Sequence, residues 1–309
     1  MMCLNALLQG YKNDYNVNQI GERSEITQCG FRLPYVFWRI FWALYHFVWI
    51  IITGVYSWQW AGPEPEEQVK WFIYLTDWCY FMLTISTLID AIVVIYVNIK
   101  QPEIVQGLYM YMFTCNRCCF DFTTGESTRM TWYLKTDWVL LNVANCSAVS
   151  VALLYWGLVH NSAEPMTAVN IETHALNAVY VILNLCVVRL PVRFYHLFHS
   201  VIYGAVYIVF SGIYYGAGGT NENGNPYIYS VIDWRKPGTA VLYSIVVVFI
   251  ALPVVHMFLY CVYLLRILIH RKCCQQFTSS KSDDINLGYH MEGSGKYTIN
   301  SNQASHGEL

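Results

Sequence analysis

The stretch WFIYLTDWCYFMLTISTLIDAIVVIYV (residues 71–97) is apolar, rich in aromatic side chains and long enough to cross a lipid bilayer. An α-helix rises ~1.5 Å per residue and the hydrocarbon core is ~30 Å thick, so about 20 residues suffice. Five further stretches have the same character: 36–58, 138–159, 171–188, 201–216 and 239–265. Backbone polar groups cannot stay unpaired in lipid, so each span is expected to be helical. The sequence predicts an all-α membrane protein, a six-transmembrane-helix bundle over residues 36–270.

The composition agrees with this class. Hydrophobic residues make up 56% of the chain and charged residues 12%, about half the ~25% of a soluble domain. Two of the spans, 171–188 and 201–216, are short and are expected to recruit flanking apolar residues. Membrane lipids are the expected partners. We expect no nucleic-acid partner, no cofactor and no metal.

The distribution of Lys and Arg predicts the orientation of the bundle. Of the 18 basic residues, fourteen lie on the side of the N-terminus, the second and fourth loops and the C-terminal tail. Three lie on the other side, and Arg39 lies within the first span. Cytosolic loops carry the excess of basic residues, so both termini are expected in the cytosol.

Two polar segments flank the expected bundle. Residues 1–35 are expected to form a cytosolic head, and residues 271–309 a disordered cytosolic tail rich in Ser, Asn and Gly. Cys273 and Cys274 follow the last span directly. Cysteines at such a position are candidates for palmitoylation, and free thiols or participation in a metal site are the alternatives.

Polar side chains inside the spans give the functional hints. Those of the second span recur at three- and four-residue steps: Thr76, Tyr80, Thr84, Thr87 and Asp90. Those of the fourth span also share one helical face: His174, Asn177 and Asn184. Buried charges in a membrane cost roughly 2.5–3.5 kcal/mol, so they normally face the bundle interior or a wet cavity. Both a role as interhelical hydrogen-bonding residues and a role in a functional cavity remain open.

One pair in these stripes has the residue types of a nucleophile and a base. Thr76 and His174 each lie a few residues inside their spans, at similar depth below the non-cytosolic interface. A Thr hydroxyl is a weak nucleophile unless a base lies within hydrogen-bonding reach. Asp77 or Glu172 would orient the imidazole. The spacing therefore predicts a Thr76–His174 catalytic pair, with packing roles for both as the alternative.

Other ionisable residues indicate a third interpretation. His46 lies midway along the first span, Asp90 in the second, and His256 in the sixth, shortly after Pro253. A proline removes one helical hydrogen bond and is expected to kink the sixth span. A proton or ion path through these three residues would make the chain a transporter.

Three runs resemble the rolling stone family of multi-pass membrane proteins, which is named for a role in myoblast fusion. They are VKWFIYLTDWCYFMLTISTLIDA (69–91), HALNAVYVILNLCVVRLPVRFYHLFHSVIYGAVYIVFSGIYYGAGGTN (174–221) and YIYSVIDWRKPGTAV (227–241). The resemblance covers about residues 36–270, and the blocks FSGIYYGAGGTN and IYSVIDW are its most specific parts. It implies a role in myogenesis, or in a related cell-surface process, at the plasma membrane rather than the endoplasmic reticulum.

The rolling stone family is in turn distantly similar to the androgen-induced gene 1 group of six-span proteins. That group hydrolyses fatty acid esters of hydroxy fatty acids with an intramembrane Thr and His. Its Thr lies in a Tyr-Leu-Thr motif that matches Tyr74-Leu75-Thr76, and its His opens the fourth span, as His174 does. The chain departs from the group at Asp77 and at the residues that follow His174. The resemblance therefore implies a lipid-ester hydrolase as the alternative to a protein of cell fusion.

Overall fold

The computed structural model describes residues 32–60, 70–100, 132–160, 167–187 and 191–269. Every regular element within these ranges is a helix, which confirms the all-α class. Five helices are long and apolar enough to cross a membrane: Tyr35–Ser57, Leu75–Tyr96, Lys135–Val159, Phe194–Gly216 and Pro237–Ile269. Residues 1–31 of the expected head, the tail and the candidate palmitoylation sites Cys273 and Cys274 lie outside the described residues, whereas residues 32–35 already belong to the first helix.

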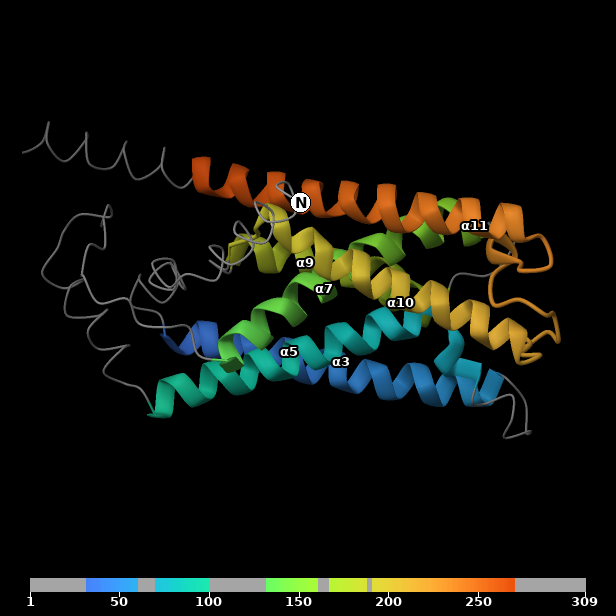
Figure 1. Cartoon of the computed structure of the whole chain (residues 1–309). Coiled ribbons are helices and arrows are strands. Elements are labelled where there is room, and N and C mark those ends of the chain that lie inside the picture. Colours follow the sequence, from blue (N-terminus) through green and yellow to red (C-terminus); the bar gives the residue numbers. More distant parts are fainter. Residues whose placement is uncertain (1–31, 61–69, 101–131, 161–166, 188–190, 270–309) are drawn as a thin grey trace, which may run out of the picture. The chain divides into compact units, whose positions relative to one another are not determined.

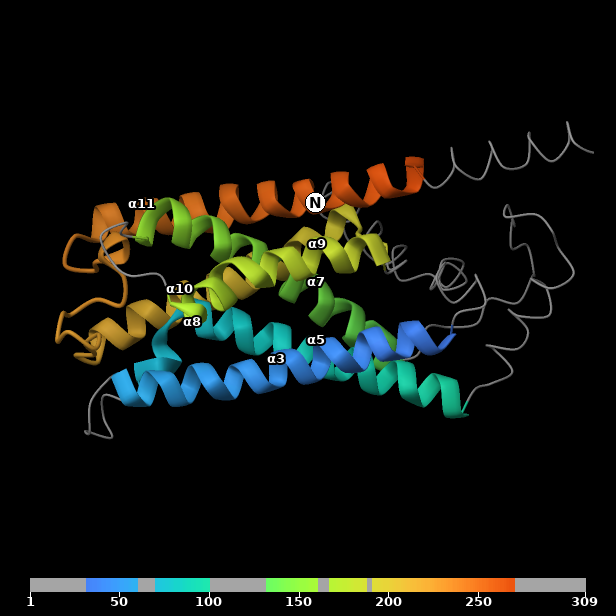
Figure 2. The same ribbon diagram turned by 180° about the vertical axis from the view of Figure 1, so that it is seen from behind.

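The first two of these helices start and end close to the expected limits. Helix α3 is Arg32–Trp60, and a 3₁₀ turn, η2 (Lys70–Ile73), leads into α5 (Leu75–Lys100). Helix α7 (Trp132–Leu154) begins earlier than expected and continues as a π-helical turn, η3 (Tyr155–Val159). Figures 1 and 2 show α3 and α5 side by side, in agreement with their many mutual contacts.

The fourth expected span is helical but differs in kind from the other five. It consists of α8 (Ala168–Ile171), a π-helical turn η4 (Glu172–Leu176), and α9 (Asn177–Val187). Its polar residues, among them the fully buried Glu172, lower its apolarity, and it is not among the five candidate membrane helices. A sixth membrane crossing and cytosolic termini therefore stay predictions.

The last two helices are longer than the sequence pattern indicated. A 3₁₀ turn, η5 (Phe194–His196), precedes α10 (Leu197–Gly216), so the short fifth span does recruit flanking residues. Helix α11 (Pro237–Val246) passes through a π-helical turn, η7 (Val247–Ala251), into a helix over residues 252–269. Pro253 lies two residues after this π turn. Because proline has no backbone N–H, the helix lacks one hydrogen bond here, and a widened turn accommodates that missing donor.

Helix α7 is the most buried of the five candidate membrane helices. It packs against α5, α9 and α10, and small side chains such as Ala144, Ser147 and Ala148 lie almost completely buried along it. Small residues let helix backbones approach closely where lipid supplies no hydrophobic driving force. By contrast, α3 exposes large apolar side chains such as Phe37, Phe41 and Ile51, as a lipid-facing surface does.

An ordered loop over residues 217–236 joins α10 to α11. Gly218 and Gly224 adopt positive φ angles of 81° and 74°, and the Asn221 side chain accepts the backbone N–H groups of Asn223 and Asn225. Glycine adopts positive φ angles without a steric penalty, and asparagine side chains commonly accept backbone N–H groups in turns. The two most specific sequence blocks thus form the end of α10 and this loop.

The loop is fastened to the beginning of α5. In the turn η2 that leads into α5, Lys70 Nζ donates to Thr220 Oγ1 (3.0 Å) and to the Asn221 carbonyl (2.9 Å) of the loop. The Tyr207 hydroxyl of α10 donates to the Ile73 carbonyl of the same turn (2.9 Å). Arg235 forms an ion pair with Asp233 (2.8 Å), and its hydrogen bonds hold the pKa of that carboxyl below its usual value. Segments far apart in sequence therefore form one structured end of the bundle.

The close packing of Gly219 gives a first prediction. A Cβ atom placed there would lie 2.4 Å from the Tyr214 ring, whose hydroxyl is tied to the Thr220 carbonyl at 2.8 Å. Gly219→Ala should therefore lower the free energy of unfolding by about 1–3 kcal/mol. Gly216→Ala is the matched control, because no atom lies within 4 Å of the position that its Cβ atom would take. Thermal unfolding in detergent measures both, and equal melting temperatures would contradict the packing described.

Candidate functional site

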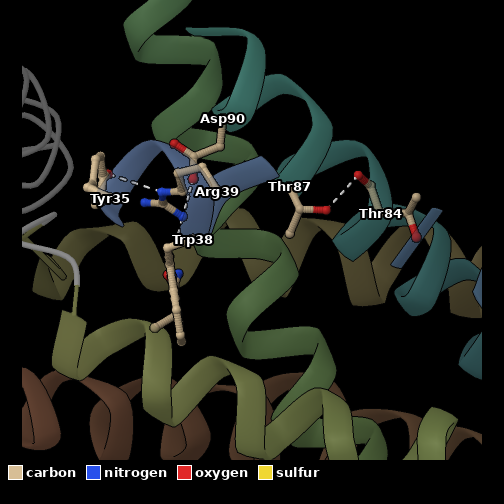
Figure 3. Close-up of polar contacts among 7 residues, drawn as sticks. Tyr35, Trp38, Arg39, Thr84, Thr87 and Asp90 are labelled. Carbon is tan, nitrogen blue, oxygen red and sulfur yellow. Dashed lines mark hydrogen bonds and ion pairs between the residues drawn. The ribbon is translucent and has the colours of Figure 1, made fainter. Parts of the chain in front are cut away.

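An ion pair between Arg39 of α3 and Asp90 of α5 lies inside the bundle (Figure 3). The two side chains are 2% and 4% exposed, so the charges are shielded from solvent almost entirely. Unpaired charges at such a depth are costly, and pairing across helices is the usual solution. The row of polar side chains on one face of α5 thus ends at Asp90, which pairs with the cationic side chain of Arg39 from the neighbouring helix.

The Arg39 guanidinium also forms a hydrogen bond with a side chain of α9. Its Nη1 donates to Asn184 Oδ1 (3.2 Å), and its Nε donates to the Tyr35 hydroxyl one helical turn earlier (3.0 Å). Trp38 Nε1 donates to the same Asn184 oxygen at 3.3 Å. Two residues expected to support a site, Asp90 and Asn184, therefore belong to one cluster that joins α3, α5 and α9.

A second buried cluster surrounds Glu172 in the π turn η4. Its carboxylate accepts a hydrogen bond from the Tyr45 hydroxyl of α3 (2.6 Å) and another from the Tyr80 hydroxyl of α5 (3.1 Å). His46 Nδ1 lies 3.3 Å from the Tyr80 hydroxyl. Glu172 and His46 are both 0% exposed. The two phenol donors provide hydrogen bonds to the Glu172 oxygen atoms at a position that water does not reach.

The π turn explains how this segment presents its polar residues. Glu172, Thr173 and His174 follow one another in sequence and are all buried. A π turn sets successive side chains at smaller angular steps than an α-helix does, and such turns are frequent at functional sites. All three successive side chains of this turn are thus covered by neighbouring parts of the protein.

His174 packs against the other π turn of this region. Its ring stacks on that of Tyr155 in η3, with centroids 3.5 Å apart and planes at 2°, and Trp156 Nε1 donates to its carbonyl (3.0 Å). His174 is 7% exposed, and its Nδ1 atom has no hydrogen-bond partner among the described residues. The imidazole is therefore held in place by stacking rather than by Asp77 or Glu172.

Thr76 has neighbours of a different kind. It lies in the first turn of α5, where the Tyr229 hydroxyl from the loop accepts the adjacent Leu75 N–H (3.0 Å). Asp77 occupies the same turn and is partly exposed. Within the part of the chain that the structure describes, Thr76 and His174 share no hydrogen bond, and their catalytic pairing stays a prediction.

The remaining polar residues of the two stripes bond to backbone carbonyls. Thr84 Oγ1 donates to the Tyr80 carbonyl (2.9 Å), Thr87 Oγ1 to the Thr84 carbonyl (3.0 Å), and Asn177 Nδ2 to the Thr173 carbonyl (2.8 Å). Figure 3 shows the Thr84–Thr87 contact on the face of α5 that carries Asp90. These bonds engage the side-chain donors within their own helical segments, while Asn177 Oδ1 has no hydrogen-bond partner among the described residues.

The ionisable residues of the transporter interpretation lie in separate clusters. Asp90 pairs with Arg39, His46 contacts Tyr80, and His256 Nε2 lies 2.8 Å from the Arg193 carbonyl. Within the described ranges, no group of three or more His, Cys, Asp or Glu side chains is arranged to hold a metal ion.

Sequence reasoning missed the roles of Tyr45 and Arg39. Tyr45 is one of several aromatic residues in its span, and nothing in its spacing marks it as the partner of a glutamate 127 residues later. Arg39 carried a usable signal, because a lone cation inside an apolar span requires a buried anion. Asp90 was the matching candidate in the neighbouring span.

The Glu172 cluster yields a second prediction. Tyr45→Phe keeps the ring and removes the shorter of the two phenol hydrogen bonds, so the unfolding free energy should fall by about 1–3 kcal/mol. Tyr56→Phe is the control, since Tyr56 lies on the same helix and is 40% exposed. The measurement is the midpoint of detergent-induced unfolding. Indistinguishable midpoints for the two variants would show that the Tyr45–Glu172 bond contributes nothing.

Comparison with known proteins places the chain among its relatives. A family model described as "Protein rolling stone" matches residues 4–282. The chain is 28% identical over 229 residues to Protein rolling stone of Drosophila melanogaster, covering 72% of this chain and 74% of that protein. No solved structure matches the chain. Since the family model spans every described helix, the chain belongs to the rolling stone family of proteins.

Proposed function

We propose that this rolling stone family member is a multi-pass protein of the plasma membrane that acts in the fusion of myoblasts or in a related joining of cells. The observation that carries this proposal is the family match, which runs across all the membrane helices and the loop 217–236. The two most specific blocks of the resemblance form the end of α10 and part of this loop. A membrane protein that brings cells together needs a defined surface outside the bilayer.

The loop 217–236 has the properties of such a surface. Lys70 donates hydrogen bonds to Thr220 and Asn221 of the loop, and the Leu75 N–H donates to the Tyr229 hydroxyl, so the loop is joined to the start of α5 at two points. The charge distribution of the sequence predicts that this end of the bundle faces away from the cytosol. On the plasma membrane it would face an opposing cell.

A cell-mixing assay tests the proposal. Myoblasts lacking the chain should fuse poorly, and re-expression of the wild-type chain should restore the fraction of multinucleate cells. Gly219→Ala should restore fusion less well than its control Gly216→Ala at equal surface abundance, because only the former distorts the loop. Normal fusion without the chain, or retention of the wild-type chain in the endoplasmic reticulum, would refute this function.

A second candidate is an intramembrane hydrolase of fatty acid esters, including those of hydroxy fatty acids. The specific observation in its favour is the imidazole of His174, which is buried and has an Nδ1 atom without a hydrogen-bond partner among the described residues. In this mechanism His174 takes the proton of the Thr76 hydroxyl as Thr76 Oγ1 attacks the ester carbonyl. The imidazolium then returns this proton to the oxygen of the departing alcohol. Water then cleaves the acyl-threonine ester and releases the fatty acid.

A fluorophosphonate probe separates the two candidates. It forms a stable phosphonyl ester with an activated hydroxyl and releases fluoride, so wild-type membranes should label at residue 76. Thr76→Ala and His174→Gln should each abolish labelling and ester hydrolysis. Thr136→Ala, at an exposed position of α7, should change neither. Absence of labelling and hydrolysis in the wild type, with fusion activity intact, would refute the hydrolase candidate. Cell fusion would then be the remaining function.

A further inference from the structure

The rings of His174 and Tyr155 are stacked face to face. Their centroids lie 3.5 Å apart and their planes are at 2°. By contrast, the buried His196 meets the Trp138 ring edge-on, with centroids 4.7 Å apart and planes at 71°. Two neutral aromatic rings prefer edge-on or offset contacts, because in a direct stack their negative faces oppose each other. The arrangement at His174 is therefore unfavourable for a neutral imidazole.

A protonated imidazole changes that balance. A cation over the face of a tyrosine ring is attracted by the negative charge of that face, and the attraction is stronger where water is excluded. His174 is 7% exposed, so little water reaches the stack. Burial by itself disfavours a charge on the imidazole. The face of the Tyr155 ring offsets part of that cost.

The π turn η3 holds the Tyr155 ring in this place. The His160 N–H donates to the Tyr155 carbonyl at 2.8 Å, which closes the turn. The next residue, Trp156, donates from its Nε1 atom to the His174 carbonyl at 3.0 Å. Two successive residues of η3 thus contact the side chain and the backbone of His174, and they join η3 to η4.

The carboxylates of this region are not available to stabilise a charge on His174. Both oxygen atoms of Glu172 accept hydrogen bonds from phenol groups, at 2.6 and 3.1 Å. Among the described residues no Asp or Glu, Asp77 included, forms an ion pair with the imidazole. The titratable side chains of the packed elements are Tyr45 of α3, Tyr80 of α5, Glu172 of η4, and Tyr155 and His160 at η3.

We infer that Tyr155 is a positioning residue that stabilises the imidazolium form of His174, an inference that rests on the proposed hydrolase function. In that function His174 carries the proton of the Thr76 hydroxyl until the alcohol leaves, so its ring is positively charged in between. In Ser-His-Asp sites a carboxylate orients the base and stabilises this charge. Here the face of the Tyr155 ring supplies both effects.

The test changes the electrostatics of the ring and keeps its shape. Carbon-13 labelling of histidine lets NMR follow the protonation of His174 in detergent, and the signal is identified by its loss in His174→Gln. Tyr155→Phe keeps the negative ring face and should leave the pH midpoint of this signal almost unchanged. Tyr155→pentafluorophenylalanine reverses the charge of the face. It should lower the midpoint by about one pH unit, a tenfold change in the protonation equilibrium.

A matched control lies on the same helix. Tyr133 of α7 contacts the ring of Tyr96 rather than a histidine, so Tyr133→pentafluorophenylalanine should not move the His174 midpoint. Equal midpoints for the two variants at position 155 would overturn the inference, because packing alone does not depend on the sign of the ring charge. A wild-type His174 that does not titrate between about pH 4 and 9 would overturn it as well.

Fluorophosphonate labelling separates this inference from the hydrolase function. A weaker base should lower the maximal labelling rate at Thr76 about threefold in the pentafluorophenylalanine variant relative to Tyr155→Phe. Labelling that is lost in Thr76→Ala but equally fast in these two variants would overturn the role of Tyr155 alone. Labelling that is absent in the wild type, or that survives Thr76→Ala, would instead refute the hydrolase function.

Discussion

The arrangement of the bundle depends on the ion pair between Arg39 and Asp90. In a membrane interior neither charge is tolerated alone, so α3 and α5 have to meet at the depth where both groups lie. Asn184 adds α9 to the same point by accepting a hydrogen bond from Arg39 at 3.2 Å. Three helices are thereby fixed in rotation and in register, which apolar packing alone does not achieve because lipid is as apolar as the helices.

The Glu172 cluster extends the same principle. Tyr45 and Tyr80 bring α3 and α5 to a carboxylate in the π turn η4, so the fourth helical segment is tied to the first two at a second point. This segment is more polar than the five candidate membrane helices, and the buried carboxyl group of Glu172 is paired with protein hydroxyl groups. The polar residues that lower its apolarity are therefore the ones that hold it in the bundle.

The sequence predicted the helical class and five of the spans well, because apolar length is a local property that lipid enforces. It also identified Asp90 and Asn184 as buried polar residues from their helical spacing. Spacing within one helix cannot identify a partner in another, so the Asn184–Arg39 and Glu172–Tyr45 bonds were not predictable. The Tyr229–Leu75 contact depends on the shape of a folded loop, for which helical periodicity carries no information. The glycine and asparagine residues of this loop are typical of turns, but they do not predict its docking on α5.

A double-mutant cycle on Arg39 and Asp90 tests the central claim most directly. Unfolding free energies would be measured in detergent for Arg39→Met, Asp90→Leu and the combined variant. Each single change leaves one buried charge without its partner and should cost about 3–5 kcal/mol. The combined variant removes both charges and should be more stable than either single variant. A combined loss equal to the sum of the two single losses would show that the side chains act independently and would contradict the account.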